Sequence, residues 1–252
     1  MRTCLGFQFL NESAWLKLHL PVILRYPFDG VVAIDGGSTD DSVFAIKHAC
    51  GRAARKLYLG QRPWDWHFDL QQNAVVERAE AEGFDALLKW DPDELLYPGH
   101  IEQAFDLLKD GAKAIKVNRI NFEDDRRHYA PYDYPDMQLR FHVLNEGWRW
   151  VGRLHAGPNV WTFWHEHPNS DPHAPRDIIW CPHINIYHYE GIKPRRERVL
   201  KQQNYQRIKD GLDPWTALPD TVAVTDGPVR FIVRYDGPQP LDPFTCGVRA
   251  PY

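Results

Sequence analysis

The segment Lys89-Trp90-Asp91-Pro92-Asp93-Glu94 closes a mostly apolar run over residues 84–90. Such a run predicts a buried strand, and its end places the carboxylates of Asp91 and Asp93 two positions apart. Because residues i and i+2 of a strand point the same way, the two side chains can converge on one ligand. Oxygen atoms are the ligands that hard cations such as Mg²⁺ and Mn²⁺ prefer. The segment therefore predicts a metal site at the end of a buried strand, beside which a phosphorylated ligand can bind.

A second acidic turn, Asp35-Gly36-Gly37-Ser38-Thr39-Asp40-Asp41, follows an apolar strand predicted at residues 31–34. It places Asp35 at the end of one strand, as Asp91 lies at the end of another. Each aspartate has a structural alternative: Asp91 and Asp93 can cap the turn that follows them, and Asp35 can bind the backbone of its own glycines. The recurrence of acidic residues at two strand ends favours a binding site over turn closure.

Length and composition limit the class of protein, since 252 residues that are 43% hydrophobic suffice for one large domain with a full core. A net charge of −4 gives no overall attraction to nucleic acid or anionic membranes. Four scattered cysteines without a CxxC pair predict reduced thiols. No segment resembles a signal peptide, and no apolar run approaches the ~18 residues of a membrane span. The sequence therefore predicts a soluble, cytoplasmic protein without a membrane span.

Strand-like and helix-like segments alternate over the first part of the chain. This order predicts an α/β fold, in which a parallel sheet is connected by crossover helices. The predicted strands are 3–10, 31–34, 56–59 and 85–90, and the predicted helices are 13–25, 39–51, 67–82 and 98–111.

After residue 113 the pattern changes to a mixture of strands and helices that predicts an antiparallel edge. Strands are predicted at 114–120, 137–144, 184–189 and 230–235, and a basic helix at 194–209. We therefore expect residues 1–112 and 113–212 to form two halves of one domain. Residues 213–252 are expected to form a Pro-rich tail with one strand.

Four motifs of the first half lie at strand ends or on a helix: Asn11-Glu12, Asp35-Gly36-Gly37-Ser38-Thr39-Asp40, Gln72-Asn73 and Asp91-Pro92-Asp93-Glu94. Three later blocks follow: Leu139-Arg140-Phe141, Trp150-Val151-Gly152-Arg153-Leu154-His155, and His188-Tyr189 before the basic helix. Together these motifs resemble the family 2 glycosyltransferases of GT-A fold, and the later blocks are similar to the short bacterial and phage members. The resemblance covers residues 3 to about 210. It implies a mixed α/β sheet with flanking helices and a C-terminal α+β extension.

The resemblance implies a metal-dependent glycosyltransferase that moves a sugar from a nucleotide-diphosphate sugar to an acceptor hydroxyl with inversion. The acceptor would be a glycan, a lipid-linked compound or another hydroxyl compound. Residues 1–112 would form the nucleotide-sugar-binding half, and residues 113–212 the acceptor and catalytic half. The matching positions assign nucleotide-sugar contacts to Asn11, Glu12, Asp35, Asn73, Asp91 and Arg153, and Mn²⁺ or Mg²⁺ ligands to Asp91, Asp93 and His188.

The residue that deprotonates the acceptor is the point where this chain departs from the family. Shorter relatives often have His-Glu where this chain has His155-Ala156. Because that carboxylate is missing, Asp136 is the first candidate for the general base, with His155 behind it. The missing carboxylate is also consistent with a protein that has lost catalytic activity.

Two other functions stay open. One is a degenerate glycosyltransferase-like protein that binds a nucleotide or glycan without turnover, because the His-Glu carboxylate is missing and Gly36 stands where many relatives have a second aspartate. The other is a glycosyltransferase that acts on modified DNA bases, which the similarity to phage members implies. The basic helix at 194–209 leaves room for a weak, salt-sensitive contact with DNA. The net negative charge disfavours this nucleic-acid contact.

Overall fold

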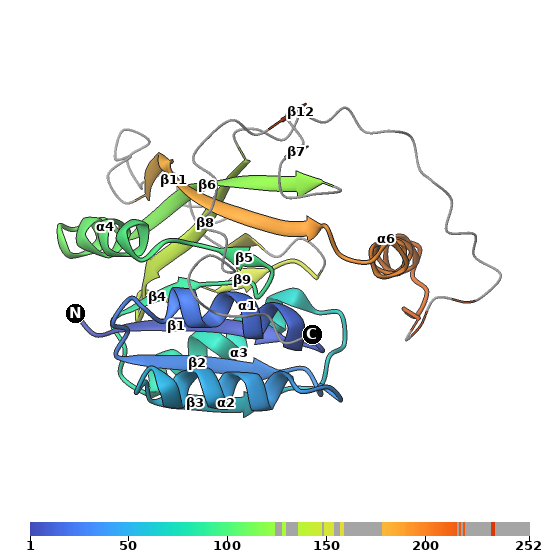
Figure 1. Ribbon diagram of the computed structural model, residues 1–252, viewed down its shortest axis with the longest axis horizontal. Coiled ribbons are helices and arrows are strands. Elements are labelled where there is room, and N and C mark those ends of the chain that lie inside the picture. Colours follow the sequence, from blue (N-terminus) through green and yellow to red (C-terminus); the bar gives the residue numbers. More distant parts are fainter. Residues whose placement is uncertain are drawn as a thin grey trace.

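The computed structural model describes residues 1–123, 128–129, 136–147, 149–153, 157–158, 178–215, 217, 219 and 233–234. These residues form a mixed α/β structure in which helices flank a large sheet (Figure 1). The strands are β1 Thr3–Phe9, β2 Gly30–Asp35, β3 Leu57–Gln61, β4 Ala86–Lys89, β5 Glu94–Leu95, β6 Ala114–Glu123, β7 His128–Tyr129, β8 Asp136–Val143, β9 Trp150–Val151, β10 Gly157–Pro158, β11 Ile178–Gly191 and β12 Val233–Arg234. The helices are α1 Ser13–Ile23, α2 Ser42–Arg52, α3 Phe68–Ala81, α4 Pro98–Lys109 and α6 Arg195–Lys209.

The large sheet is parallel in its first part and mixed beyond it. Its main path runs β12-β7-β6-β8-β4-β1-β2-β3, with β5 and β11 attached to one side of this path. β1 is parallel to β2 and β4, and β2 is parallel to β3. β8 runs antiparallel between β4 and β6. β9 and β10 pair separately from this sheet.

The central parallel strands are buried because helices cover both faces of the sheet. Every residue of β1, β2 and β4 is buried, which agrees with their nearly continuous apolar sequence. α1, α2 and α4 pack on one face through residues such as Leu16, Ile46 and Ile101. α3 packs on the other face through Val75 and Val76. This packing fixes the strand ends that carry the polar loops.

The late strand β11 brings residues from the second half to the end of β4. It runs parallel to β6 and antiparallel to the short β5, which follows the Asp91-Pro92-Asp93 turn. In this register His188 is the partner of Glu94 on β5 and of Asn121 on β6. The N–H of Tyr189 donates to the Asp93 carbonyl at 2.9 Å. β11 then leads into α6, which lies to the side of the sheet (Figure 1).

The predicted order of strands and helices through α4 is confirmed. The strands expected at 114–120, 137–144 and 184–189 are present as β6, β8 and part of β11, and the basic helix is α6. The prediction misses β5, because a strand of two residues carries no periodic pattern. Among the described helices, none combines the length and the apolar character that a membrane span needs.

Candidate functional site

The carboxyl ends of β1, β2 and β4 meet at one edge of the sheet. There the N–H of Gly36 donates to the Phe9 carbonyl at 2.8 Å and joins the first two strand ends. The loops after these strands carry three predicted groups: Asn11-Glu12, the Asp35 turn and Asp91-Pro92-Asp93. In open α/β sheets, ligands bind outside this edge.

Asp35 and Asn11 shape the loops after β2 and β1. Asp35 is 8% exposed, and its Oδ1 accepts from the N–H groups of Gly37 at 3.1 Å and Ser38 at 2.8 Å. Asn11 has a φ of 54°, and its Oδ1 accepts from the N–H of Thr39 at 2.8 Å. Asp35 therefore closes its own turn, and Asn11 connects the loop after β1 to the loop after β2.

Asp91 is paired with two cations. Lys89 Nζ lies 2.6 Å and Arg140 Nη2 lies 3.1 Å from the Oδ2 atom of Asp91. Arg140 also donates to Glu94, through Nε to Oε2 at 3.0 Å and through Nη2 to Oε1. Burial by itself raises the pKa of Asp91, but the charges of Lys89 and Arg140 outweigh burial and hold that pKa below its ordinary value. Asp91 is thus an anion whose charge is already compensated.

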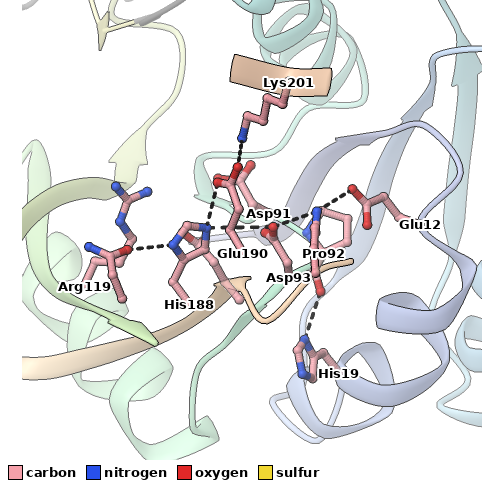
Figure 2. Close-up of polar contacts among 12 residues, drawn as sticks. Glu12, His19, Asp91, Pro92, Asp93, Arg119, His188, Glu190 and Lys201 are labelled. Carbon is pink, nitrogen blue, oxygen red and sulfur yellow. Dashed lines mark hydrogen bonds and ion pairs between the residues drawn. The ribbon is translucent and has the colours of Figure 1, made fainter. Parts of the chain in front are cut away.

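Asp93, His188 and Glu190 each offer one ligand atom within 4.8 Å of one another (Figure 2). His188 Nε2 lies 3.8 Å from Asp93 Oδ2 and 3.6 Å from Glu190 Oε2. Asp93 and His188 are buried. Two carboxylates and an imidazole form a donor set that suits a divalent transition-metal ion such as Mn²⁺. The cluster contains two of the predicted metal ligands, Asp93 and His188, and adds Glu190 to them.

A chain of hydrogen bonds orients the ring of His188. Its Nδ1 lies 2.7 Å from Asn121 Oδ1, and Asn121 Nδ2 donates to Asp136 Oδ2 at 3.0 Å. An amide oxygen only accepts hydrogen bonds, so Nδ1 carries the proton and Nε2 keeps its lone pair. Burial lowers the pKa of His188, which favours the neutral imidazole that binds metal ions.

Two lysines from the region of α6 contact the acids of this site. Lys193 Nζ lies 2.8 Å from Asp93 Oδ2 and 2.9 Å from Glu12 Oε1, and Lys201 Nζ lies 2.5 Å from Glu190 Oε1. Burial raises the pKa of Glu12 to about 7, although Lys193 opposes this shift. Burial lowers the pKa of Lys193, but Asp93 and Glu12 outweigh it and raise that pKa above its ordinary value. Lys193 is therefore charged at neutral pH.

These groups line a cleft of about 1350 Å³ that reaches from the strand ends to α6. Part of its lining is aromatic: the ring centroids of Trp66 and Phe68 lie 6.4 and 6.1 Å from that of Tyr205 on α6. Trp66 has a φ of 61°, a strained conformation for a bulky residue. A bidentate ion pair between Arg62 and Asp65, at 2.9 and 2.7 Å, braces the same loop. The cleft therefore combines a charged part with a rigid aromatic part.

Six predicted site residues line this cleft: Asn11, Glu12, Asp91, Asp93, Arg153 and His188. Three others, Asp35, Asn73 and Asp136, are described but lie outside its lining. His155 lies outside the described residues. The structure thus brings the first strand-end loop, the Asp91-Pro92-Asp93 turn and β11 together in one cavity.

Asn73 and Asp136 are engaged within the protein. Asn73 exchanges two hydrogen bonds with the backbone of Trp150, accepting at 2.7 Å and donating at 2.9 Å. Burial by itself raises the pKa of Asp136, but the Arg119 charge and side-chain donors outweigh it and lower that pKa. The donors to Asp136 are Arg119, Asn121 and Gln138.

The sequence-based prediction misses Glu190, Asn121 and the positions of the two lysines. Glu190 carries a signal, because it stands two positions after His188 on a strand, the spacing that also relates Asp91 and Asp93. Lys193 and Lys201 belong to a basic segment in which spacing does not distinguish inward from outward cations. Asn121 carries no signal, because its contact with His188 arises from the pairing of two distant strands.

No protein-family model matches the sequence, and no curated protein matches it. Solved structures match by fold. Glucosyl-3-phosphoglycerate synthase from Mycobacterium tuberculosis, in complex with phosphoglyceric acid, gives a TM-score of 0.50 at 13% identity, over 87% of this chain and 81% of that chain. A mycobacterial protein gives a TM-score of 0.50 at 12% identity, over 80% of this chain and 73% of that chain. S. aureus TarS 1-349 in complex with UDP gives 0.43 at 14% identity, over 50% of this chain.

This chain spans 37% of the length of that TarS structure and most of the length of the other two. At these identities the likeness concerns the fold, and it confirms the predicted fold class. The chain therefore has the GT-A glycosyltransferase fold, a mixed α/β sheet with flanking helices.

Proposed function

We propose that this protein is a metal-dependent glycosyltransferase that moves a sugar from a nucleotide-diphosphate sugar to an acceptor hydroxyl. The observation that carries the proposal is the cluster of Asp93, His188 and Glu190, placed in a large cleft at the carboxyl end of β4. The GT-A fold supports it by analogy. One neighbour with this fold bears the name of a glucosyl-3-phosphoglycerate synthase, which is consistent with sugar transfer.

The donor set favours Mn²⁺ over Mg²⁺. Mg²⁺ prefers oxygen ligands and keeps several waters, whereas an imidazole nitrogen suits transition-metal ions. The lone pair of His188 Nε2 faces carboxylate oxygens of Asp93 and Glu190 at 3.8 and 3.6 Å, an arrangement that a cation stabilises. When bound, the ion neutralises the charge that develops on the departing nucleoside diphosphate.

The other predicted residues receive roles from their positions. Asn11 and Asp35 shape the loops beside which the base or ribose of the donor is proposed to lie. Asp91, whose charge is compensated by two cations, presents a fixed carboxylate at the carboxyl end of β4. Arg153 lines the cleft and offers a guanidinium group to the donor or acceptor.

The proposed reaction is a single displacement with inversion, as in family 2 enzymes. Asp136 is the first candidate for the general base, and His155 is the second. The lowered pKa of Asp136 makes it a weak base. This observation favours a second candidate function, a glycosyltransferase-like protein that binds its donor without transferring the sugar.

The test is a panel of UDP, GDP, CDP and dTDP sugars, each with and without Mn²⁺, read by thermal unfolding and by donor hydrolysis. A ligand at a hundredfold excess over its Kd stabilises the folded state by about 2.7 kcal/mol, so the correct donor raises Tm. We expect Asp93→Asn to abolish the Mn²⁺-dependent shift and the hydrolysis. Asp106→Asn, at an α4 side chain that is 56% exposed, is the matched control.

The outcomes separate the two candidates. Metal-dependent binding together with hydrolysis or transfer supports the enzyme. Metal-dependent binding without any turnover supports the binding protein. No response of the wild type to any of these donors contradicts both.

A further inference from the structure

Lys193 and Lys201 hold the carboxylates to which a metal ion would bind. Lys193 Nζ lies 2.8 Å from Asp93 Oδ2. Lys201 Nζ lies 2.5 Å from Glu190 Oε1 (Figure 2). Both acids belong to the cluster that includes His188. The Lys193 side chain is only 15% exposed, and its ammonium group also contacts Glu12 at 2.9 Å. The two ammonium groups therefore lie close to the position that a metal ion would occupy in this cluster.

A divalent cation competes with Lys193 for Asp93 Oδ2 and with Lys201 for the carboxylate group of Glu190. Like charges a few ångströms apart in a partly buried site repel one another, much more than they do in bulk water. Lys193 and Lys201 must therefore weaken or give up their ion pairs when a cation occupies the cluster.

The displaced lysines stay in the cleft, because both of them line it. The four-carbon stem of lysine is flexible, so the ammonium group can change partners while the backbone stays in place. An anion bound in the same cleft provides those new partners. In a nucleotide sugar whose sugar is neutral, the charged group is the diphosphate.

The charges of the side chains that contact the two lysines also favour a diphosphate as the bound anion. Three carboxylates, on Glu12, Asp93 and Glu190, face the two ammonium groups of Lys193 and Lys201. A divalent cation alone changes this small negative excess into a positive one. The two negative charges of a bound diphosphate offset the two positive charges of the cation. The two ligands together therefore leave the net charge of this group unchanged, whereas either one alone changes it by two.

We propose, resting on the proposed function, that Lys193 and Lys201 are diphosphate-binding residues of this cleft and that a divalent cation at Asp93, His188 and Glu190 releases them for that role. The cation and the diphosphate then bind with positive coupling, because each one compensates charges that the other leaves unpaired. Removing a lysine should therefore affect the two ligands in opposite directions.

The first measurement is the binding of Mn²⁺ alone, followed by electron paramagnetic resonance of the free ion. Methionine keeps the length of the lysine side chain without its charge, so Lys193→Met and Lys201→Met are each compared with the wild type. We expect each substitution to tighten Mn²⁺ binding by about tenfold or more. Lys113→Met, which removes a half-exposed lysine paired with Glu146, should leave it unchanged. Unchanged or weaker Mn²⁺ binding in both cleft variants overturns the proposal.

The second measurement is calorimetric binding of inorganic pyrophosphate and of UDP at saturating Mn²⁺. We expect both cleft variants to bind these anions about tenfold more weakly, because each has lost a charge-assisted contact. A purely structural role would not tighten the metal and weaken the anion together. Unchanged pyrophosphate binding in both variants overturns the assignment of the lysines to the diphosphate.

Stability is measured alongside, because Lys193→Met leaves Asp93 and Glu12 without their shared cation. If that variant does not fold, Lys201→Met decides, since the Glu190 side chain is 29% exposed and remains solvated. A wild type that transfers no sugar but shows both lysine effects contradicts the proposed function and supports this inference. A wild type that binds no Mn²⁺ contradicts both.

Discussion

His188 Nδ1 and Asn121 Oδ1 lie 2.7 Å apart across the pairing of β11 with β6. This bond leaves Nε2 of His188 facing the carboxylates of Asp93 and Glu190. Asn121 is itself held by Asp136, to which it donates at 3.0 Å. One partly buried amide, that of Asn121, thus sets both the tautomer and the direction of the imidazole in the cluster.

We expect Asn121→Ala to weaken Mn²⁺ binding by about 10- to 100-fold, because the ring of His188 loses the partner that orients it. The measurement is the resonance of free Mn²⁺ in a titration. Asn185→Ala is a matched control, because Asn185 accepts from Asn118 at 2.8 Å across the same pair of strands. Equal losses in the two variants would indicate general damage to the sheet and contradict the orienting role.

The buried His142 and His188 should make the fold less stable in acid. Burial lowers the pKa of both below the ordinary value of 6.5. Between the lowered pKa of the folded state and the ordinary pKa of the unfolded state, the unfolded chain binds protons that the folded chain does not. Their stabilisation is therefore complete above the ordinary pKa and is lost as the pH falls through the lower folded pKa values.

The measurement is the free energy of unfolding in urea, in metal-free buffer, from about pH 7.5 to about pH 5. We expect His142→Gln and His188→Gln each to reduce the slope with pH. His48→Gln, at an exposed position of α2, should keep it. A slope that is the same in all three variants would refute the assignment to the buried rings.

Asn73→Ala should act on stability more than on ligand binding. The Asn73 side chain satisfies both the N–H and the carbonyl of Trp150, so its loss should cost about 1–3 kcal/mol. The free energy of unfolding and the Kd for UDP are measured together. Gln206→Ala, which removes an exposed bond to Asp210, is the control. A large loss of UDP binding with unchanged stability would instead support a nucleotide contact at Asn73.

Arg140→Met should be strongly destabilising. The side chains of Arg140 and Glu94 are 4% and 0% exposed, and Arg140 also compensates Asp91. Removing the cation leaves the carboxylate of Glu94 without its ion-pair partner in the interior, whereas Asp91 keeps Lys89; this loss costs about 3–5 kcal/mol. Urea unfolding measures this loss. Arg149→Met, which breaks a partly exposed pair with Glu80, should cost about 1 kcal/mol or less. Similar costs at the two sites would contradict this account.

The placement of Asp35, Asp91 and Asp93 could be predicted because it depends on local pattern. Apolar runs marked the strands, and the alternation with helices made those strands parallel, so their carboxyl ends had to meet at one edge. The structure confirms these elements as β2 and β4. The same pattern could not show how the polar atoms are used, and Asp35 Oδ1 binds the backbone of its own turn.

The second half of the cluster could not be assembled from local pattern. Asn121 reaches His188, and His188 and Glu190 reach Asp93, because β11 pairs with β6 and β5 in one particular register. A shift of that register by one residue would turn each side chain to the other face. Sequence periodicity indicates that a strand exists, but it does not identify the strand beside it.

β11 also determines when the cluster of Asp93, His188 and Glu190 becomes complete during synthesis of the chain. The N-terminal part contains Asp93 and the strands that support it, whereas His188 and Glu190 are supplied only by the last long strand described. A nascent chain that has emerged only through α4 has one of the three cluster ligands. The three ligands are therefore brought together only after β11 has left the ribosome and paired with β5 and β6.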